Sequence, residues 1–155
     1  MTAPSKGYIG KGTVFSIGSG GTGETFVAVA QLKTAQFGGQ KMNFEDITNL
    51  DSASVGATVL KEQMPTTADA GTVALSGIFL PSDAGQTALT TAYNGALTDF
   101  KIQLPKGPLQ TTTGNLYTFS GYVSEQPLPD IQFDKVLTFK VTITLTTPIT
   151  STPGT

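Results

Sequence analysis

A glycine-rich run is the part of the sequence whose spacing comes closest to a known chemical motif. Gly18, Gly20 and Gly23 satisfy the pattern GxGxxG, and the residues before them are typical of a strand. A dinucleotide site of this kind needs a helix directly after the glycines, because the amides at the helix N-terminus bind the pyrophosphate. The TFVAVAQL that follows is rich in β-branched residues. We therefore predict a hairpin loop between strands at 13–17 and 25–32, and no cofactor.

Two pairs of acidic residues are further candidates for chemistry. Glu45 and Asp46 are adjacent in a segment that alternates like a strand, so their side chains point to opposite faces and cannot act together as acid and base. Asp130 and Asp134 lie in a proline-containing loop whose carbonyls could bind calcium, but their spacing does not match an EF-hand. Turn formation by aspartate is the interpretation we favour, and we predict no metal site.

The tyrosines could line a sugar-binding groove. They are Tyr8, Tyr93, Tyr117 and Tyr122, and the chain has no tryptophan to accompany them. Tyr117 and Tyr122 have opposite parity on one predicted strand, so only one of them can face the core. Packing in the core or at a subunit contact is the interpretation we favour. A monomeric carbohydrate-binding or adhesin β-sandwich stays as an alternative.

The residue inventory excludes most catalytic arrangements. The 155 residues include no histidine, cysteine, tryptophan or arginine, which removes Ser-His and Cys-His nucleophiles and imidazole or thiolate metal ligands. Nine lysines against eleven acidic residues give a net charge of −2 and no basic patch for gripping nucleic acid. We predict a protein that is not an enzyme. We also expect its surface to carry mostly small, uncharged side chains, which favours self-association.

The length predicts a single domain over 1–155, with an N-terminal arm at 1–12 and a flexible C-terminal tail at 147–155. The N-terminus lacks the apolar core of a signal peptide, and no later run is long enough to cross a bilayer. These features predict a soluble protein made in a cytoplasm, without membrane insertion.

The clearest local prediction is a strand–helix–strand unit over 71–104. Its first part alternates apolar and polar residues and ends at Pro81. Asp83 and Gln86 then resemble a capping box for a helix over about 83–94. After the helix, the chain returns to the period of a strand.

Two later segments complete the predicted sheets. Residues 116–123 can pair with 98–104, and residues 136–146 have the cleanest alternation in the chain, which is typical of a central strand. With a long loop at about 38–70, these elements predict a mainly β fold, a two-sheet antiparallel β-sandwich or barrel with one flanking α-helix. The predicted core consists of Val73, Leu75, Phe79, Leu89, Tyr93, Phe100, Ile102, Phe119, Leu137, Phe139, Val141 and Ile143.

The order of these segments resembles the major tail tube proteins of long-tailed, non-contractile, lambda-like bacteriophages (siphoviruses). The resemblance covers about residues 10–146, and it rests on the order and spacing of GTVFSIGSG, EDITNLDS, GTVALSGIFLPSDAGQTAL, AYNGALTDFKIQLP and LYTFSGYVSEQ. It implies a structural virion protein, a β-sandwich with a flanking helix whose copies form hexameric rings. The rings stack head to tail into the tail tube, through which the genome is ejected into the host.

The resemblance also implies partners and a location. The partners are other copies of the chain, the tape measure protein, the tail tip or initiator and the tail terminator, while DNA passes only transiently. The location is the virion tail, assembled in the cytoplasm of the bacterial host. Residues 37–70 correspond to the loop by which rings of this family contact one another. The apolar candidates for that inter-ring contact are Phe37, Met42, Phe44, Met64 and Pro65.

A second machine shares this fold, so the resemblance leaves an alternative open. The chain could be the tube subunit of a type VI secretion system or of a contractile tail.

An arginine-free, slightly acidic composition suits a conduit for DNA, because each phosphate neutralised by a cation would add a salt-sensitive contact.

Overall fold

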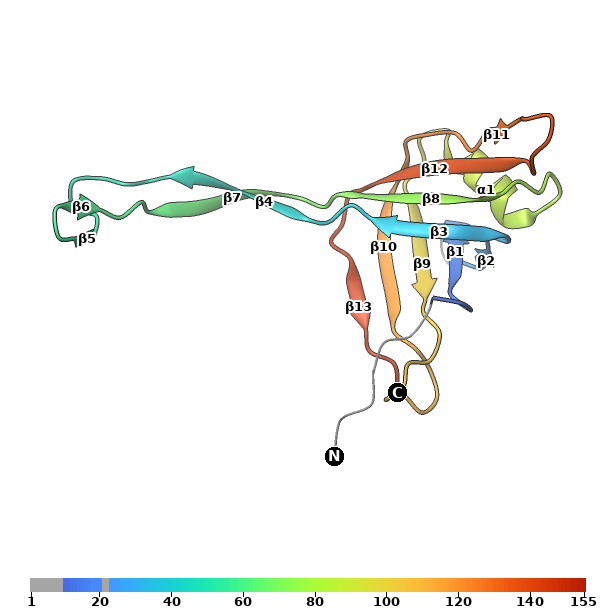
Figure 1. The fold of residues 1–155 in the computed structure, drawn as a ribbon, viewed down its shortest axis with the longest axis horizontal. Helices are drawn as coiled ribbons and strands as arrows, with labels where there is room; N and C mark the ends of the chain where they lie inside the picture. Colours follow the sequence, from blue (N-terminus) through green and yellow to red (C-terminus); the bar gives the residue numbers. More distant parts are fainter. Residues whose placement is uncertain (1–9, 21–22) are drawn as a thin grey trace.

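Nine strands pair into one antiparallel sheet (Figure 1). The computed structural model describes residues 10–20 and 23–155, so most of the predicted N-terminal arm lies outside the described residues. The strands of this sheet are β1 (Val14–Gly18), β2 (Phe26–Ala28), β3 (Leu32–Phe37), β8 (Thr72–Ile78), β9 (Thr98–Gln103), β10 (Leu116–Val123), β11 (Pro129–Asp130), β12 (Thr138–Leu145) and β13 (Thr150–Thr152). Their order is β2-β1-β9-β10-β12-β8-β3, with β11 paired to β12 and β13 to β10.

The sheet folds over where β10 meets β12. These strands pair only through residues 121–123 and 143–145, at one end of each. A side chain at Gly121 would place its Cβ 2.4 Å from the carbonyl oxygen of Thr144, so glycine permits the close approach at this corner. As a result, β2, β1, β9, β10 and β13 form one layer, and β12, β8 and β3 form a second layer that runs across it (Figure 1).

The apolar side chains of both layers meet between them. The ring centroids of Phe100 and Phe119 are 5.6 Å apart, and those of Phe15 and Phe100 are 5.7 Å apart. Each side chain of this kind contributes about 1.5–3 kcal/mol to folding when it is fully buried. The predicted core residues that are buried are Val73, Leu75, Leu89, Phe100, Ile102, Phe119, Phe139, Val141 and Ile143.

Three predicted core residues lie nearer the surface. Tyr93 is 43% exposed, so its prediction as a core residue is wrong. It is the C-cap of the helix, beyond the last turn that packs on the sheet. Phe79 and Leu137 are only partly buried, because they lie just outside β8 and β12, where Phe79 N donates to Leu137 O at the margin of the layer.

The predicted helix is present as α1 (Ala84–Ala92) and flanks the sandwich beside β1 and β2. Asp83 is its N-cap, and the Asp83 carboxylate accepts hydrogen bonds from the amides of Gln86 (3.0 Å) and Ala30 (3.2 Å). The side chain of Gln86 does not return to Asp83 as a capping box would. It is buried, and it accepts from Leu80 N at 2.9 Å. No helix among the described residues is long and apolar enough to cross a membrane.

The segment predicted as a long loop at 38–70 is a β-ribbon instead. β4 (Lys41–Asp46) pairs with β7 (Gln63–Asp69), and β5 (Ser54–Val55) pairs with β6 (Thr58–Val59) at the tip. These four strands, called the ribbon below, continue from β3 and β8 and project far beyond the sandwich (Figure 1). All residues of β4 and β7 are exposed, and no burial imposed on β7 the alternation that the sequence shows in β4.

The C-terminal residues are also paired, and the prediction of a flexible tail is wrong. β13 pairs with residues 116–118 of β10, along the edge that β12 leaves open. The carbonyl of Thr155 accepts hydrogen bonds from the amides of Thr111, Thr112 and Thr113 at 2.7–3.0 Å. The tail therefore completes the first layer.

Candidate assembly surfaces

The glycine-rich run forms the turn of a hairpin, as predicted. β1 and β2 pair directly on either side of it. Gly20 and Gly23 have positive φ angles of 77° and 76°, and the amide of Gly20 donates to the carboxylate of Glu24 at 3.1 Å. The element after the run is a strand and not a helix, so no helix N-terminus faces these glycines. The arrangement that a bound pyrophosphate requires is not formed by the described residues of the run.

Glu45 and Asp46 lie on the ribbon, where adjacent residues of β4 face opposite sides. Hydrogen bonds from the side chain and amide of Thr48 lower the pKa of Asp46, and Lys61, whose Nζ is 3.6 Å away, adds to this effect. Asp46 is therefore an ionised carboxylate that stabilises the turn after β4. Glu45, which faces the opposite side, cannot act together with it in acid–base chemistry.

The second acidic pair lies in the segment between β10 and β12. The carboxylate of Asp130 accepts a hydrogen bond from Gln132 Nε2 at 3.2 Å, and Asp134 is exposed. Among the described residues, no three acidic, histidine or cysteine side chains are placed to hold a metal ion. The hydrogen bond from Gln132 fits the role of a turn-forming aspartate.

The three tyrosines within the described residues do not share a groove. Tyr117 is half-buried and packs against Phe37, with the ring centroids 6.0 Å apart. Tyr122 points to the outer face of the same strand and is 41% exposed, while Tyr93 lies at the end of α1. Tyr8 is outside the described residues. These positions offer no row of aromatic side chains for a sugar.

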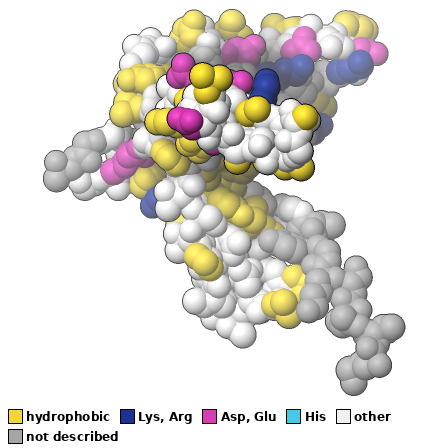
Figure 2. All heavy atoms as spheres, turned by 90° about the vertical axis from the view of Figure 1, so that its left-hand side faces the viewer, with side chains coloured by type: hydrophobic (Ala, Val, Ile, Leu, Met, Phe, Trp, Pro, Cys, Tyr) yellow, Lys and Arg dark blue, Asp and Glu magenta, His cyan; other side chains and the backbone are white. Residues whose placement is uncertain are grey.

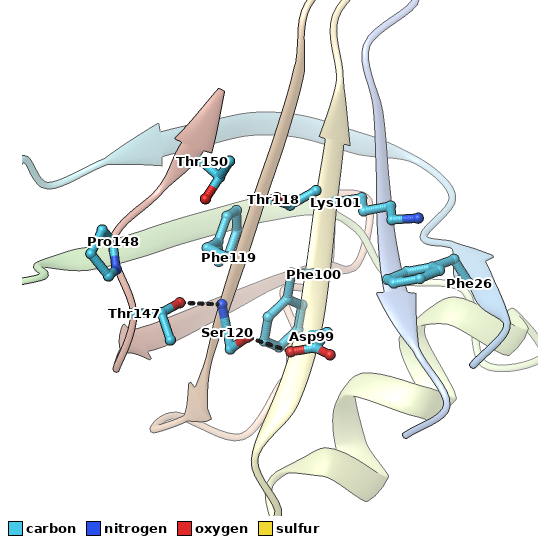
Figure 3. Close-up of a pocket in the computed structure, with 10 residues that line it drawn as sticks. All are labelled: Phe26, Asp99, Phe100, Lys101, Thr118, Phe119, Ser120, Thr147, Pro148 and Thr150. Atoms are coloured by element: carbon cyan, nitrogen blue, oxygen red, sulfur yellow. Dashed lines mark hydrogen bonds between the residues drawn. The ribbon is translucent and has the colours of Figure 1, made fainter. Parts of the chain in front are cut away.

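A shallow hollow lies on the outer face of the first layer, over β9 and β10 (Figure 3). The hydroxyl of Ser120 donates to Asp99, and the amide of Ser120 donates to Thr147 Oγ1 at 3.0 Å. Lys101 Nζ lies 3.7 Å from the ring centroid of Phe26, a cation–π contact. These contacts join the strands at the surface.

The ribbon carries exposed apolar side chains. Met42 and Phe44 are 55% and 56% exposed on β4, and both point to one face of the ribbon, where Pro65 is the cross-strand partner of Phe44. Met64 is also exposed but faces the opposite side, as the cross-strand partner of Glu45. The ribbon thus carries apolar side chains on both faces and has no core of its own.

The ribbon is also the acidic part of the chain. Residues 40–70 contain five acidic residues and two lysines, a net charge of −3 in a chain whose total is −2. Figure 2 looks from the side toward which the ribbon points and shows hydrophobic side chains next to acidic ones there. A partner for this surface must therefore offer apolar contacts together with positive charge.

Phe37, which was grouped with the ribbon residues, occupies a different place. It is the last residue of β3, at the base of the ribbon, and is 37% exposed. Its ring packs across the sandwich against Phe119, with the centroids 6.0 Å apart. Phe37 therefore links the core to the point where the ribbon begins.

No protein-family model and no curated protein sequence matches the chain. Solved structures do. A chain from the tail of an empty gene transfer agent (GTA) particle, computed with C6 symmetry, superposes with a TM-score of 0.67 at 14% identity, covering 94% of this chain and 99% of that one. The SPP1 tail tube gives a TM-score of 0.63 at 13% identity, covering 94% of this chain and 78% of that one.

A structure from a contractile machine is similar as well. The sheath-tube complex of the extracellular contractile injection system PVC gives a TM-score of 0.61 at 11% identity, covering 91% of this chain and 88% of that one. At such low identity these likenesses establish the fold. The chain has the fold found in tail tubes and in a contractile injection system.

Proposed function

We propose that this chain is the structural subunit of a phage tail tube. Its copies form hexameric rings, and the rings stack head to tail into the conduit through which the genome is ejected. The observation that carries this proposal is the shared fold, which extends over 94% of this chain and 99% of a GTA tail chain. The C6 symmetry of that particle supports a ring of six. The role is non-enzymatic.

The edges of the sheet support association between copies. β2 and β3 are the end strands of the described sheet, and each leaves one row of backbone N–H and C=O groups without a strand partner. Such edges promote association with further strands. Pairing with strands of other copies in the assembly removes these edges, as closure does in a barrel.

The ribbon supports stacking of the rings. It holds Met42, Phe44, Met64 and Pro65 away from the core of its own chain, with Phe37 at its base. A contact between this projection and a different surface of another copy does not close on itself, so it generates a filament. These five residues form the proposed inter-ring contact.

The remaining parts of the proposal concern location and partners. The tube belongs to the virion tail and is assembled in the host cytoplasm with a tape measure protein, a tail tip or initiator and a tail terminator. The chain has no arginine and a net charge of −2, which suits DNA that must pass without being held.

The likeness to the PVC sheath-tube complex favours one second candidate, the tube of a contractile machine. Both candidates predict the same tube. The two candidates differ in whether a sheath protein surrounds the tube. Assemblies purified from the native source will contain a sheath subunit only if the machine is contractile. The separated tyrosines give no support to a carbohydrate-binding domain.

Negative-stain electron microscopy of the purified protein over a concentration series tests the proposal. We expect rings with a central hole at intermediate concentrations and tubes at the highest. Sedimentation of the same samples measures the fraction assembled. Particles that stay monomeric at every concentration, by both methods, would contradict it.

A further inference from the structure

The sandwich is open on one side, between β1 and β3. The opening is a cleft of about 740 Å³. Its apolar lining belongs to both layers and consists of Phe15, Leu32, Ala35, Phe37, Ile102 and Leu104. Ala35 faces this interior but is exposed, because β3 ends the sheet and no further strand from the described residues covers it. The cleft therefore presents core-type surface at the side of the molecule.

The rim of this cleft is positive. Lys11 and Lys33 line it, and both are exposed. None of the described residues that line the cleft is acidic. Lys33 lies at the irregularity where the pairing of β3 with β8 shifts register, and the other edge of β3 has no strand partner among the described residues. An apolar floor, cationic rim and open strand edge together fit an extended, acidic segment with apolar side chains.

The ribbon has these properties. One face carries Met42 and Phe44, and Asp46 follows on that face by the alternation of β4. β4 contains no proline, whereas Pro65 removes one amide donor from β7, so β4 offers the more complete edge for pairing. The net charge of −3 over 40–70 complements the lysines at the rim.

The ribbon of the same chain cannot fill the cleft. It continues directly from β3, away from the sandwich (Figure 1). Nine residues separate Ala35 from Phe44, which is about 30 Å in an extended strand. The occupant must come from a second copy.

We propose that the cleft between β1 and β3 receives the Met42 and Phe44 face of the ribbon of a second copy, with Lys11 and Lys33 next to its carboxylates. This inference rests on the proposed tube and adds the receiving surface. In an assembled tube every copy is both donor and receiver. The contact buries Met42 and Phe44, which the single chain leaves exposed.

Single-cysteine variants test the contact directly, because the natural chain has no cysteine. Ala35→Cys places a thiol in the cleft. Ala68→Cys places one on the ribbon, at the cross-strand partner of Met42. The two variants, one carrying a mass tag, are mixed, assembled and treated with a short bis-maleimide. We expect a crosslinked dimer of one tagged and one untagged chain in tubes, and none in dilute monomer.

Lys140→Cys is the matched control, since Lys140 is exposed on the outer face of β12. It replaces Ala35→Cys in the mixture, and we expect no mixed dimer with Ala68→Cys. Tubes that give no Ala35–Ala68 crosslink, or an equal yield with the Lys140 control, would overturn the inference while leaving the tube function in place. A natural chain that forms no tubes would overturn both.

Charge reversal gives a second, independent readout. The double variant Lys11→Glu and Lys33→Glu is expected to raise the concentration at which tubes form by about tenfold or more, because it places like charges opposite each other. Lys140→Glu is expected to leave that concentration within about twofold. Equal effects of the cleft and control variants would contradict a role for the cleft.

Discussion

The sandwich and the ribbon hold their strands together by different means. In β12 every second side chain is buried, from Phe139 to Leu145, and packs between two layers. In β4 and β7 all residues are exposed, and the strands have only each other. Cross-strand pairs contribute about 0.2–1 kcal/mol each, and an isolated two-stranded hairpin is marginally stable in water. The apolar residues of the ribbon therefore add little to the fold of one chain, as their proposed contact with a second copy requires.

The junction between the two regions is built from glycine. Gly39 and Gly71 lie opposite each other with positive φ angles of 79° and 86°. A Cβ on Gly71 would lie 2.4 Å from the carbonyl oxygen of Gly39. A side chain therefore does not fit at Gly71, and the ribbon beyond this point lacks the packing that holds β3 and β8 in place.

The largest effect on stability is expected in the sandwich. Replacing Phe139, which is 1% exposed, by alanine should lower the free energy of unfolding by about 3–5 kcal/mol, because a cavity remains in the core. Phe44→Ala is the matched change in the ribbon and should alter it by less than about 0.5 kcal/mol. Urea denaturation of monomer measures both. A similar loss for the two variants would remove the distinction between the regions.

For assembly into tubes, we expect the larger effect from a change in the ribbon. Phe44→Asp should leave the unfolding transition of the monomer unchanged and abolish tubes, because it places a charge in the apolar contact. Asn43→Asp makes the same charge change at the neighbouring residue, which faces the other side of the ribbon, and should assemble at most a few-fold less readily. Sedimentation scores the assembled fraction. Unfolded Phe44→Asp monomer would show that Phe44 supports the fold.

A smaller loss of stability is expected where the helix joins the sandwich. Gln86 is buried, and its side chain satisfies the amide of Leu80 and the carbonyls of Ala30 and Ile78. Gln86→Ala should lower the free energy of unfolding by about 1–3 kcal/mol, because these backbone groups lose their partner. Gln63→Ala on the ribbon should change it little. A negligible effect at Gln86 would mean that water replaces its contacts.

The smallest effect is expected from Asp46. Its pKa is lowered by the hydrogen bonds from Thr48 and by Lys61, so the ionised form is favoured in the folded state. A lowered pKa stabilises the folded state above the ordinary value of 3.8, and that contribution is lost as pH falls through the lowered pKa. The exposed position keeps this effect local to the ribbon. An NMR titration of Asp46 in the Thr48→Ala variant should show its pKa rise toward 3.8, and an unchanged titration would contradict the assignment.

The sequence predicted the parts of the fold that burial imposes. β8, β9, β10, β12 and α1 all follow from apolar periodicity, and the pairing of 98–104 with 116–123 was predicted because only a short connection separates them. The ribbon was missed because β7 contains Pro65 and polar residues that resemble a loop. β13 was missed because its pairing depends on an edge of β10 that β12 leaves open.

The candidate surfaces were predictable only in part. The apolar residues of 42–65 were predicted as contact residues because the resemblance to tail tube proteins implies an inter-ring loop at 37–70. Their division between two faces required the register of β4 against β7. The cleft depends on residues as distant as Lys11, Lys33 and Ile102, which only the folded layers bring together. No local pattern in the sequence encodes that placement.

Amide hydrogen exchange of the ribbon, measured in the monomer and in assembled tubes, tests most directly whether the ribbon binds a second copy of the chain. In the monomer we expect exchange within seconds over 41–69 and slow exchange in β8 and β12. In tubes the amides of β4 should become protected by at least about a hundredfold, because burial against another copy suppresses opening. Equally fast exchange of the ribbon in tubes and in monomer would contradict the account.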